Sequence, residues 1–347
     1  EPHNDSYTVI RGDFDRWLAE QAVEEGATLI RETTVTGLLR ENDDREDRGA
    51  IRGVETDRPD GELEAPVVVL AEGANSLVSE QEKLKKKQER ADVAVAAKEV
   101  LKFDRDVLEN RFRLDEDAGV AFNYFGEGAV GDAVGGGFIY TNKRTLSVGV
   151  AYRMEDAASN QQSPHDVLDE FKSHPAVAPL VRDGRLVEYS AHAIPEGGYD
   201  AVPDVVHDGA VIAGDAAGLV LNNGAHLEGT NMAIESGYYA GKAVADAVEK
   251  GKTDAAALES YRANLENSFV MKNLEHYNWF HEVMADDREF LFEELPGALA
   301  DFETEFFRVD GTPKEEHIED AKESLLEATG GWIGAVRKAW KYRRMLS

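Results

Sequence analysis

Hydrophobic and polar residues recur along the first part of this chain with two different periods, which separate helices from strands. Apolar positions at helical spacing follow Asp13, a capping-type residue, and Gly26 provides a stop, so we predict an amphipathic helix between them. The next apolar run, 28–39, predicts a strand, and 51–56 is its expected hairpin partner.

Two further apolar runs end in loops of small residues. Residues 62–70 are apolar and β-branched, as in a strand buried on both faces of a parallel sheet, and they lead directly into the loop 71–76. Residues 210–213 predict a second short buried strand, followed by the loop 214–218 and a long helical pattern over 230–250. This order of strand, loop and helix favours an α/β domain with a parallel sheet.

The middle of the chain, from Ala94 to about Tyr189, consists of shorter alternating segments. Within it, 138–142 and 145–152 predict antiparallel strands around a turn. We therefore expect a second, sheet-rich domain here, and from Ala255 to the end the pattern is helical.

The chain is strongly acidic. Its 347 residues include 68 Asp and Glu against 38 Lys and Arg, a net charge of −30, and such a surface repels phosphate backbones, which argues against nucleic acid as a partner. The basic run 83–90 is predicted to be a solvated helix face without a function. Because salt screens self-repulsion, we expect the protein to work in a halophile's cytoplasm.

Cysteine is absent, which excludes disulfides, thiolate nucleophiles and any iron–sulfur cluster ligated by this chain. The apolar runs are far shorter than the roughly 20 residues that a membrane-spanning helix needs. The sequence begins with Glu1 rather than Met, so we expect the native N-terminus to lie upstream.

The strongest motif runs from Gly214 to Gly237. A strand that ends in Gly-Asp, a glycine loop and a helix allow a backbone to approach an extended ligand closely. Asp215 would accept hydrogen bonds from ligand hydroxyls, and the free amide groups near Gly229 and Thr230 would face an anionic or electron-rich ring. An ordinary strand-to-helix turn capped by Asp215 explains the spacing equally well.

Other motifs leave their roles open. Arg11 lies just ahead of a helix start and either holds a phosphate or ribityl oxygen or pairs with a carboxylate. The turn Ile194–Tyr199 (IPEGGY) either closes a ligand site or joins two domains. His192 and His226 lack metal-ligand spacing, so we predict no metal site, and we find no catalytic acid–base pair.

Taken in order, segments over nearly the whole chain resemble one family, the FixC-type flavoproteins. These are relatives of electron-transfer flavoprotein:quinone oxidoreductases within the geranylgeranyl reductase superfamily. The stretches that carry the resemblance are SYTVIRGDFDRWLAEQA (6–22), TDRPDGELEAPVVVLAEGANSL (56–77), GGGFIYTNKRTLSVGV (135–150), FKSHPAVAPLV (171–181), VEYSAHAIPEGGYDAVP (187–203) and GDAAGLVLNNG (214–224).

The resemblance implies FAD as the cofactor and the transfer of electrons from an electron-transfer flavoprotein to a quinone. It places particular residues at the cofactor. The implied cofactor-binding residues are Arg11 and Val35 near the dinucleotide, Asp215 on the ribityl chain, Gly218 in the glycine loop, and Gly229 and Thr230 beside the flavin ring.

The same resemblance implies the fold and its division. It is an FAD-binding α/β fold with a doubly wound parallel sheet, a second antiparallel-sheet domain and a helical C-terminal region. The expected boundaries are a partial FAD-binding domain over 1–90, a sheet-rich quinone domain over 91–195, the second part of the FAD-binding domain over 196–250 and a helical region over 251–347. We expect Phe138, Tyr140 and Tyr199 either to line the quinone pocket or to pack in the core.

The implied partners are an electron-transfer flavoprotein of the FixA/FixB type and a separate ferredoxin-like protein of the FixX type, because the chain has no cysteine for a cluster of its own. The basic C-terminal segment 332–346, with its Trp residues, either lies on an anionic membrane surface or docks on the acidic body of the protein. We expect a cytoplasmic protein, which the first alternative would bring to the inner face of the membrane. The alternatives are an FAD-dependent isoprenoid double-bond reductase and a flavin-free interaction subunit.

Two departures from the family stand out. Relatives begin with a strand, a G-x-G-x-x-G turn and a helix that bind the ADP half of FAD, and no such segment precedes Ser6, so roughly the first quarter of the expected protein is missing. Glu228 stands where relatives commonly have a basic residue, and a carboxylate there would disfavour an anionic reduced flavin unless it points away.

Overall fold

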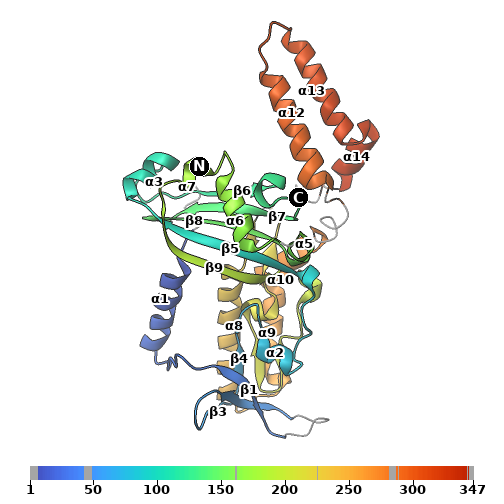
Figure 1. Cartoon of the computed structure of the whole chain (residues 1–347). Helices are drawn as coiled ribbons and strands as arrows, with labels where there is room; N and C mark the ends of the chain where they lie inside the picture. Colours follow the sequence, from blue (N-terminus) through green and yellow to red (C-terminus); the bar gives the residue numbers. More distant parts are fainter. Residues whose placement is uncertain are drawn as a thin grey trace.

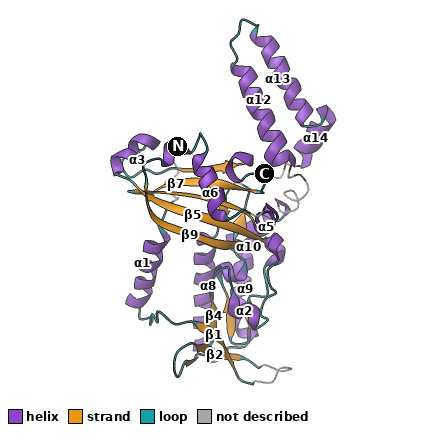
Figure 2. Cartoon of the chain, in the orientation of Figure 1, coloured by secondary structure: helices purple, strands orange, loops and turns teal. Residues whose placement is uncertain are grey.

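A computed structural model describes residues 7–42, 49–160, 162–224, 226–280, 287, 289–341 and 343. Figures 1 and 2 show a large antiparallel sheet that crosses above a group of helices and smaller sheets, with a helical hairpin projecting beside it. The fold is therefore mixed α/β with antiparallel sheets and a helical C-terminal region, as the sequence predicted.

The first segment contains the predicted helix, α1 (Arg11–Glu24), and Gly26 follows it with φ of +102°. None of the residues of α1 is buried, and its apolar Trp17 is 53% exposed. The predicted strand over 28–39 is shorter than expected, because β1 begins only at Val35. Its hairpin partner has the predicted bounds, and the antiparallel strands of this sheet are β1 (Val35–Arg40), β2 (Ile51–Thr56) and β3 (Glu62–Glu64).

The run 62–70 does not form one buried strand. It splits at Pro66 into β3 and β4 (Val68–Leu70), because proline lacks the amide that a continuous ladder needs. Val69 is 41% exposed, so the prediction of burial on both faces is wrong. β4 pairs in parallel with β11 (Ala210–Ile212), which also pairs with the antiparallel β10 (Val206–His207). Parallel pairing within the described residues is thus limited to β4 and β11.

The middle segment forms a five-stranded antiparallel sheet in the order β6-β7-β8-β5-β9. It contains both strands predicted around a turn. The bounds are β5 (Val93–Lys102), β6 (Ala121–Phe125), β7 (Gly135–Thr141), β8 (Thr145–Arg153) and β9 (Arg185–Pro195).

Helices cover one face of this sheet. They are α3 (Arg105–Phe112), α4 (Glu127–Val130), α5 (Met154–Asn160), α6 (Pro164–Ser173) and α7 (Ala178–Val181). Phe171 of α6 lies directly against Gly137 of β7, where an added Cβ would be 2.4 Å from the Phe171 Cζ. Because neighbours along a strand face opposite sides, Phe138 and Tyr140 lie on the face that these helices do not cover.

A second core forms around the strand β11. It packs against α8 (Thr230–Glu249), α9 (Ala255–Asn267) and α10 (Phe269–Tyr277). The bounds of α8 agree with the helix predicted over 230–250. The remaining short elements of this region are α2 (Leu77–Gln81), η1 (Arg90–Asp92), η2 (Tyr199–Ala201), η3 (Gly214–Ala217), β12 (Leu221–Asn222) and β13 (Leu227–Glu228).

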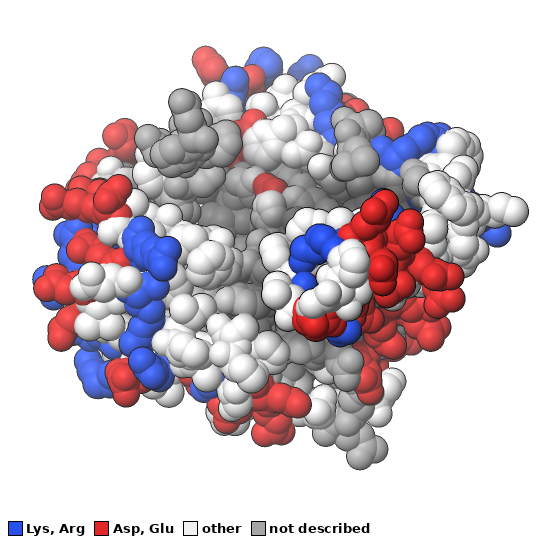
Figure 3. Space-filling model, turned by 90° about the horizontal axis from the view of Figure 1, so that it is seen from above, with Lys and Arg blue, Asp and Glu red and all other residues white. Residues whose placement is uncertain are grey.

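The C-terminal region is helical, as predicted. Its elements are the π-helical turn η4 (Phe290–Glu294), α12 (Leu295–Phe307), α13 (Lys314–Ala328) and α14 (Gly331–Lys341). No described helix is both long enough and apolar enough to cross a membrane. Seen from above, Asp and Glu gather on one side of the molecule, whereas elsewhere acidic and basic residues are mixed (Figure 3).

Candidate functional site

The glycine loop that begins at Gly214 is held from both sides by buried side chains. The strand before it ends with a hydrogen bond from the Ala213 amide to the Leu70 carbonyl, at 3.0 Å. The Gly214 amide donates to the Ser236 hydroxyl at 3.0 Å, and the Tyr261 hydroxyl donates to the Ile212 carbonyl at 2.8 Å. The loop is therefore fixed by α8 and α9 before any ligand binds.

Lys85 provides a third anchor. It is 9% exposed, and its ammonium donates to the Ala216 carbonyl at 3.0 Å and to the Ser76 hydroxyl at 3.1 Å. Ser76 in turn donates to the Gly73 carbonyl at 2.8 Å. Lys85 thus joins the two small-residue loops that follow β4 and β11. The basic run 83–90 was predicted to be a solvated helix face, but residues 83–89 are not helical and Lys85 is buried, while Lys86 and Lys87 are exposed.

Asp215 is the polar centre of this loop. Burial raises the pKa of its carboxyl, and the charges of Arg11 and His192 act in the opposite direction. Burial also lowers the pKa of His192, with Lys98 and Arg11 acting the same way and Asp215 against them. Within the described residues, no side chain of another residue donates a hydrogen bond to the Asp215 carboxylate. The carboxylate is consequently available to hydroxyl groups of a ligand.

Arg11 lies at the N-terminal end of α1 and reaches the same site. Its guanidinium binds Asp15 through Nε at 2.8 Å and through Nη2 at 3.0 Å, and this bond raises the pKa of Arg11. The charges of Asp215 and Tyr140 also raise that pKa, more weakly than Asp15 does. Tyr140 stacks on Phe138, with ring centroids 5.7 Å apart.

The start of α8 faces Asp215. A Cβ added to Gly229 would be 3.6 Å from the Asp215 Oδ1, which places the first turn of α8 beside the carboxylate. No side chain caps this helix, and its first turn carries no acidic residue. Thr230 is exposed, and Gly218 has φ of +70° with open space where a Cβ would be. Free amides at a helix N-terminus attract negative or electron-rich groups.

Glu228, the unusual residue before Gly229, is already bound by its neighbours. Its carboxylate accepts hydrogen bonds from Asn223 Nδ2 at 3.3 Å and Asn231 Nδ2 at 2.8 Å, and His226 Nε2 lies 2.9 Å away. These contacts fix Glu228 within the β12–β13 hairpin.

The structure does not bring every predicted residue to this place. Val35 lies at the start of β1, whereas the loop that carries Asp215 follows β11, a strand of a different sheet. Tyr199 packs against the core around β11, and its amide donates to Asn278 Oδ1 at 3.2 Å. Lys85, Ser236 and Tyr261 were not predicted, because no local pattern marks them.

Together, the observations fit an extended cofactor such as FAD. Asp215 presents a half-buried carboxylate that nothing else in the described chain binds, and the uncapped start of α8 offers amide donors next to it. Gly218 leaves space where a side chain would block approach. The residues present therefore suit hydroxyls on one side and an electron-rich ring on the other.

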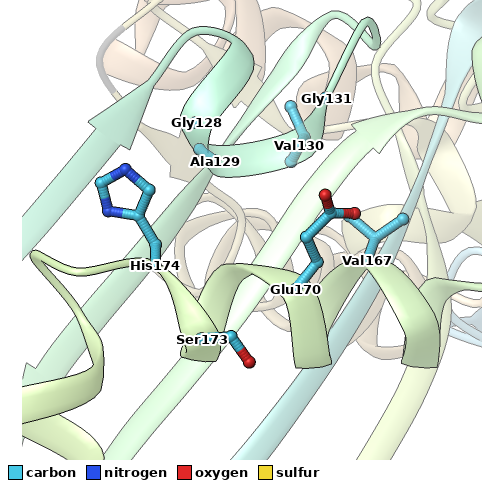
Figure 4. Close-up of a pocket in the computed structure, with 8 residues that line it drawn as sticks. All are labelled: Gly128, Ala129, Val130, Gly131, Val167, Glu170, Ser173 and His174. Atoms are coloured by element: carbon cyan, nitrogen blue, oxygen red, sulfur yellow. The ribbon is translucent and has the colours of Figure 1, made fainter.

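A separate cavity lies away from this site. It has a volume of about 520 Å³ and lies between α4 and α6, on the helix-covered side of the five-stranded sheet (Figure 4). Glu170 and His174 point from α6 toward α4, whereas Ser173 points away and donates to the Asp169 carbonyl at 2.8 Å. We assign this cavity no role.

One group of side chains has the spacing of a metal site. Glu99, His165 and Asp169 lie close enough together to share an ion. However, the Lys172 ammonium binds Glu99 at 2.9 Å and Asp169 at 2.7 Å, so a cation of the protein already occupies the space between the carboxylates.

Comparisons with known proteins agree with this geometry. Residues 2–274 match the family described as FAD binding domain, and residues 280–347 match the ETF-QO/FixC family C-terminal domain. Protein FixC of Bradyrhizobium diazoefficiens is 40% identical over 99% of this chain and 77% of its own length. The probable electron transfer flavoprotein-quinone oxidoreductase YdiS of Escherichia coli is 38% identical over 90% of this chain and 71% of its own length.

Among solved structures, a geranylgeranyl bacteriochlorophyll reductase-like protein from Thermoplasma acidophilum is similar in fold. Its TM-score is 0.65, and the match covers 94% of this chain and 76% of that chain. At 19% sequence identity, this likeness shows the fold alone.

Proposed function

Because the chain belongs to the ETF-QO/FixC family of FAD-binding proteins, we propose that it takes electrons from an electron-transfer flavoprotein and delivers them to a quinone. The observation within the molecule that supports this most is the half-buried Asp215 carboxylate opposite the uncapped start of α8. FAD supplies the redox chemistry, since a flavin accepts and releases electrons singly or in pairs.

The protein's own residues would bind and orient that cofactor. Asp215 would accept hydrogen bonds from the ribityl hydroxyls, and Gly218 would let the backbone approach them. Gly229 and Thr230 would present amides and the helix dipole to the flavin ring, which favours negative charge there. Arg11 and Val35 would lie along the dinucleotide. The boundaries at 90, 195 and 250 would separate the FAD-binding parts, the quinone domain and the helical region.

The uncovered face of the five-stranded sheet would form the quinone pocket. Phe138 and Tyr140 stack on each other there, and they would offer an apolar wall with a hydroxyl at its edge. Tyr199 has no place in this proposal, because it packs in the other core.

The proposed partners follow from membership of the same family. The electron donor would be an electron-transfer flavoprotein of the FixA/FixB type. Since the chain has no cysteine, any iron–sulfur cluster would belong to a separate ferredoxin-like protein of the FixX type.

Contact with a membrane surface would use α14. Its Trp332, Ile333, Val336 and Trp340 are between 64% and 87% exposed. Arg337 is exposed beside them, although Lys338 lies 3.7 Å from Glu294 and is partly engaged by the protein itself. Part of the basic segment, at 342 and 344–346, lies outside the described residues.

We place the protein in the cytoplasm, at the inner face of the membrane, and attribute its net charge of −30 to a salt-rich, haloarchaeal-type interior. Flotation with anionic vesicles should be weakened by Trp340→Ser, and equal flotation would exclude this contact.

The test of the proposed function is electron transfer between the named partners. Reduced electron-transfer flavoprotein and a short-chain quinone are mixed with the FAD-loaded protein, and quinone absorbance is followed without oxygen. We expect reduction that requires this protein and that Asp215→Ala abolishes by loss of flavin, while Asp13→Ala, an exposed control in α1, leaves it unchanged. Quinone that stays oxidised with the wild-type protein would refute the proposal.

A further inference from the structure

The IPEGG turn after β9 carries a carboxyl group that the proposed function has not used. Glu196 lies where this turn meets η1, and its amide donates to the Asp92 carbonyl at 2.7 Å. The turn leaves little space for another conformation: a Cβ on Gly197 would be 2.4 Å from the Ala201 Cβ, and Gly198 has φ of +67°. The backbone therefore holds the Glu196 side chain in a fixed place.

Glu196 lines a cavity of about 200 Å³ at the end of the five-stranded sheet. With roughly 30 Å³ for each water molecule in the liquid, this space holds several waters. The other polar side chains of the wall are those of Asp92, Tyr152, Arg153 and Asn222. Such a polar wall favours a hydrated cavity over an empty one.

Burial of Glu196 brings the titration of its carboxyl close to neutral pH. Burial raises the pKa of Glu196 to about 7, while Arg153 and the hydrogen bond from Asn222 Nδ2 at 3.3 Å act in the opposite direction. The Arg153 guanidinium also forms an ion pair with Glu155, at 3.4 Å. This pairing weakens the effect of the Arg153 charge on Glu196. Burial raises the pKa of Tyr152 to about 12, so the phenol does not titrate in this range.

Two more carboxyl groups belong to the elements around Glu196: Asp92 of η1, which lines the cavity, and Asp200 of η2. The Asp200 side chain is engaged outside the cavity. Its carboxylate accepts a hydrogen bond at 2.7 Å from Nδ2 of Asn278, the residue that follows α10. Glu196 thus combines a place in the cavity wall with a pKa that burial raises to about 7.

Asn222 connects this carboxyl to the candidate flavin site. It belongs to β12, where Leu221 pairs with Glu228 and Asn222 with Leu227, so Gly229 follows directly after the hairpin. At about 3.3 Å per residue along a strand and roughly 5 Å between strands, Asn222 and Gly229 lie on the order of 10 Å apart. Glu196 lies one side-chain contact beyond Asn222. A unit charge at roughly 10–15 Å, with an effective dielectric constant near 20, shifts a pKa by about one unit.

We propose that Glu196 and its cavity form a proton-holding site that is linked to the redox state of the flavin beside α8. This inference rests on the proposed function. Converting a quinone to a quinol takes two electrons, which the electron-transfer flavoprotein supplies, and two protons, which come from water. Negative charge gained at the start of α8 strengthens proton binding at Glu196, so the carboxyl takes up a proton from the cavity as electrons arrive. It returns the proton to the cavity water when the electrons leave.

The experiment measures the midpoint potential of the bound flavin against pH, with dithionite as the reductant. No partner protein is needed, so the result is independent of whether electron-transfer flavoprotein and quinone are the true partners. In the wild type we expect the slope of potential against pH to change near pH 7. Glu196→Gln should lose this change, while Glu116→Gln, the same substitution at an exposed site, keeps it. A change of slope that persists in Glu196→Gln, or none in the wild type, would overturn the proposal.

A second measurement guards against a folding defect and needs no flavin. Because the pKa of Glu196 is higher in the folded state than its ordinary value of 4.5, ionisation of this carboxyl opposes folding. The penalty begins as pH rises above about 4.5 and is complete above about 7. Glu196→Gln should therefore gain thermal stability relative to the wild type between pH 5 and pH 8. A difference in melting temperature that does not change with pH would contradict the assignment.

Discussion

Lys85→Met tests whether the buried ammonium positions the glycine loop for the cofactor. Methionine keeps most of the side-chain volume but removes both donors, so the Ala216 carbonyl and the Ser76 hydroxyl lose contacts of 3.0 and 3.1 Å. A buried carbonyl without a partner costs about 1–3 kcal/mol. In the wild type, desolvation of the buried ammonium lowers the pKa of Lys85 and opposes folding. Methionine removes this desolvation penalty. These effects offset each other in overall stability.

They do not offset each other in FAD binding, because the loop that carries Asp215 loses one of its three anchors and part of its ordering then falls on the ligand. If about 1.4 kcal/mol of that ordering falls on the binding step, the Kd for FAD rises about tenfold. The assay is a titration of flavin-free protein with FAD, followed by flavin fluorescence, for Lys85→Met and for Lys87→Met. Lys87 is exposed in the same basic run and serves as the matched control. Equal Kd values for wild type and Lys85→Met would refute the reasoning.

Two further predictions concern the packing that supports the site. Gly137→Ala places a Cβ 2.4 Å from the Phe171 ring, so it should lower the free energy of unfolding by about 1–3 kcal/mol in urea titrations. The control is Gly237→Ala, where a Cβ meets no atom within 4 Å; it should be neutral or stabilising. If both variants unfold at the same urea concentration, the close approach of α6 to β7 is wrong. Tyr261→Phe leaves the Ile212 carbonyl without its 2.8 Å hydrogen bond and should cost about 1–3 kcal/mol in the same titration; an unchanged midpoint would show that this bond does not hold β11.

The sequence predicted those elements whose signal is local. The hairpin strands β1 and β2, the pair β7 and β8, and the helix α8 each carry their own periodicity, and the structure confirms them. The prediction of a single strand over 62–70 was wrong, because Pro66 interrupts the segment.

The candidate site was only partly predictable for the same reason. Asp215 and Gly229 belong to one continuous motif, so their proximity follows from the chain itself. The burial of Lys85 depends on a carbonyl 131 residues away, and nothing in the surrounding basic run distinguishes it. Glu196 could be singled out as part of a shaped turn, but its burial and its cavity depend on η1, β7, β8 and β12, which are distant from it in the sequence.

Amide hydrogen exchange with and without FAD tests the central claim most directly. The account places the cofactor between the glycine loop and the first turn of α8, where free amides gain partners when it binds. We predict that FAD slows exchange in peptides covering 214–218 and 229–232 more than in the helical hairpin α12–α13. If FAD binds while those peptides exchange at the same rate as in the flavin-free protein, the cofactor lies elsewhere and the account is wrong.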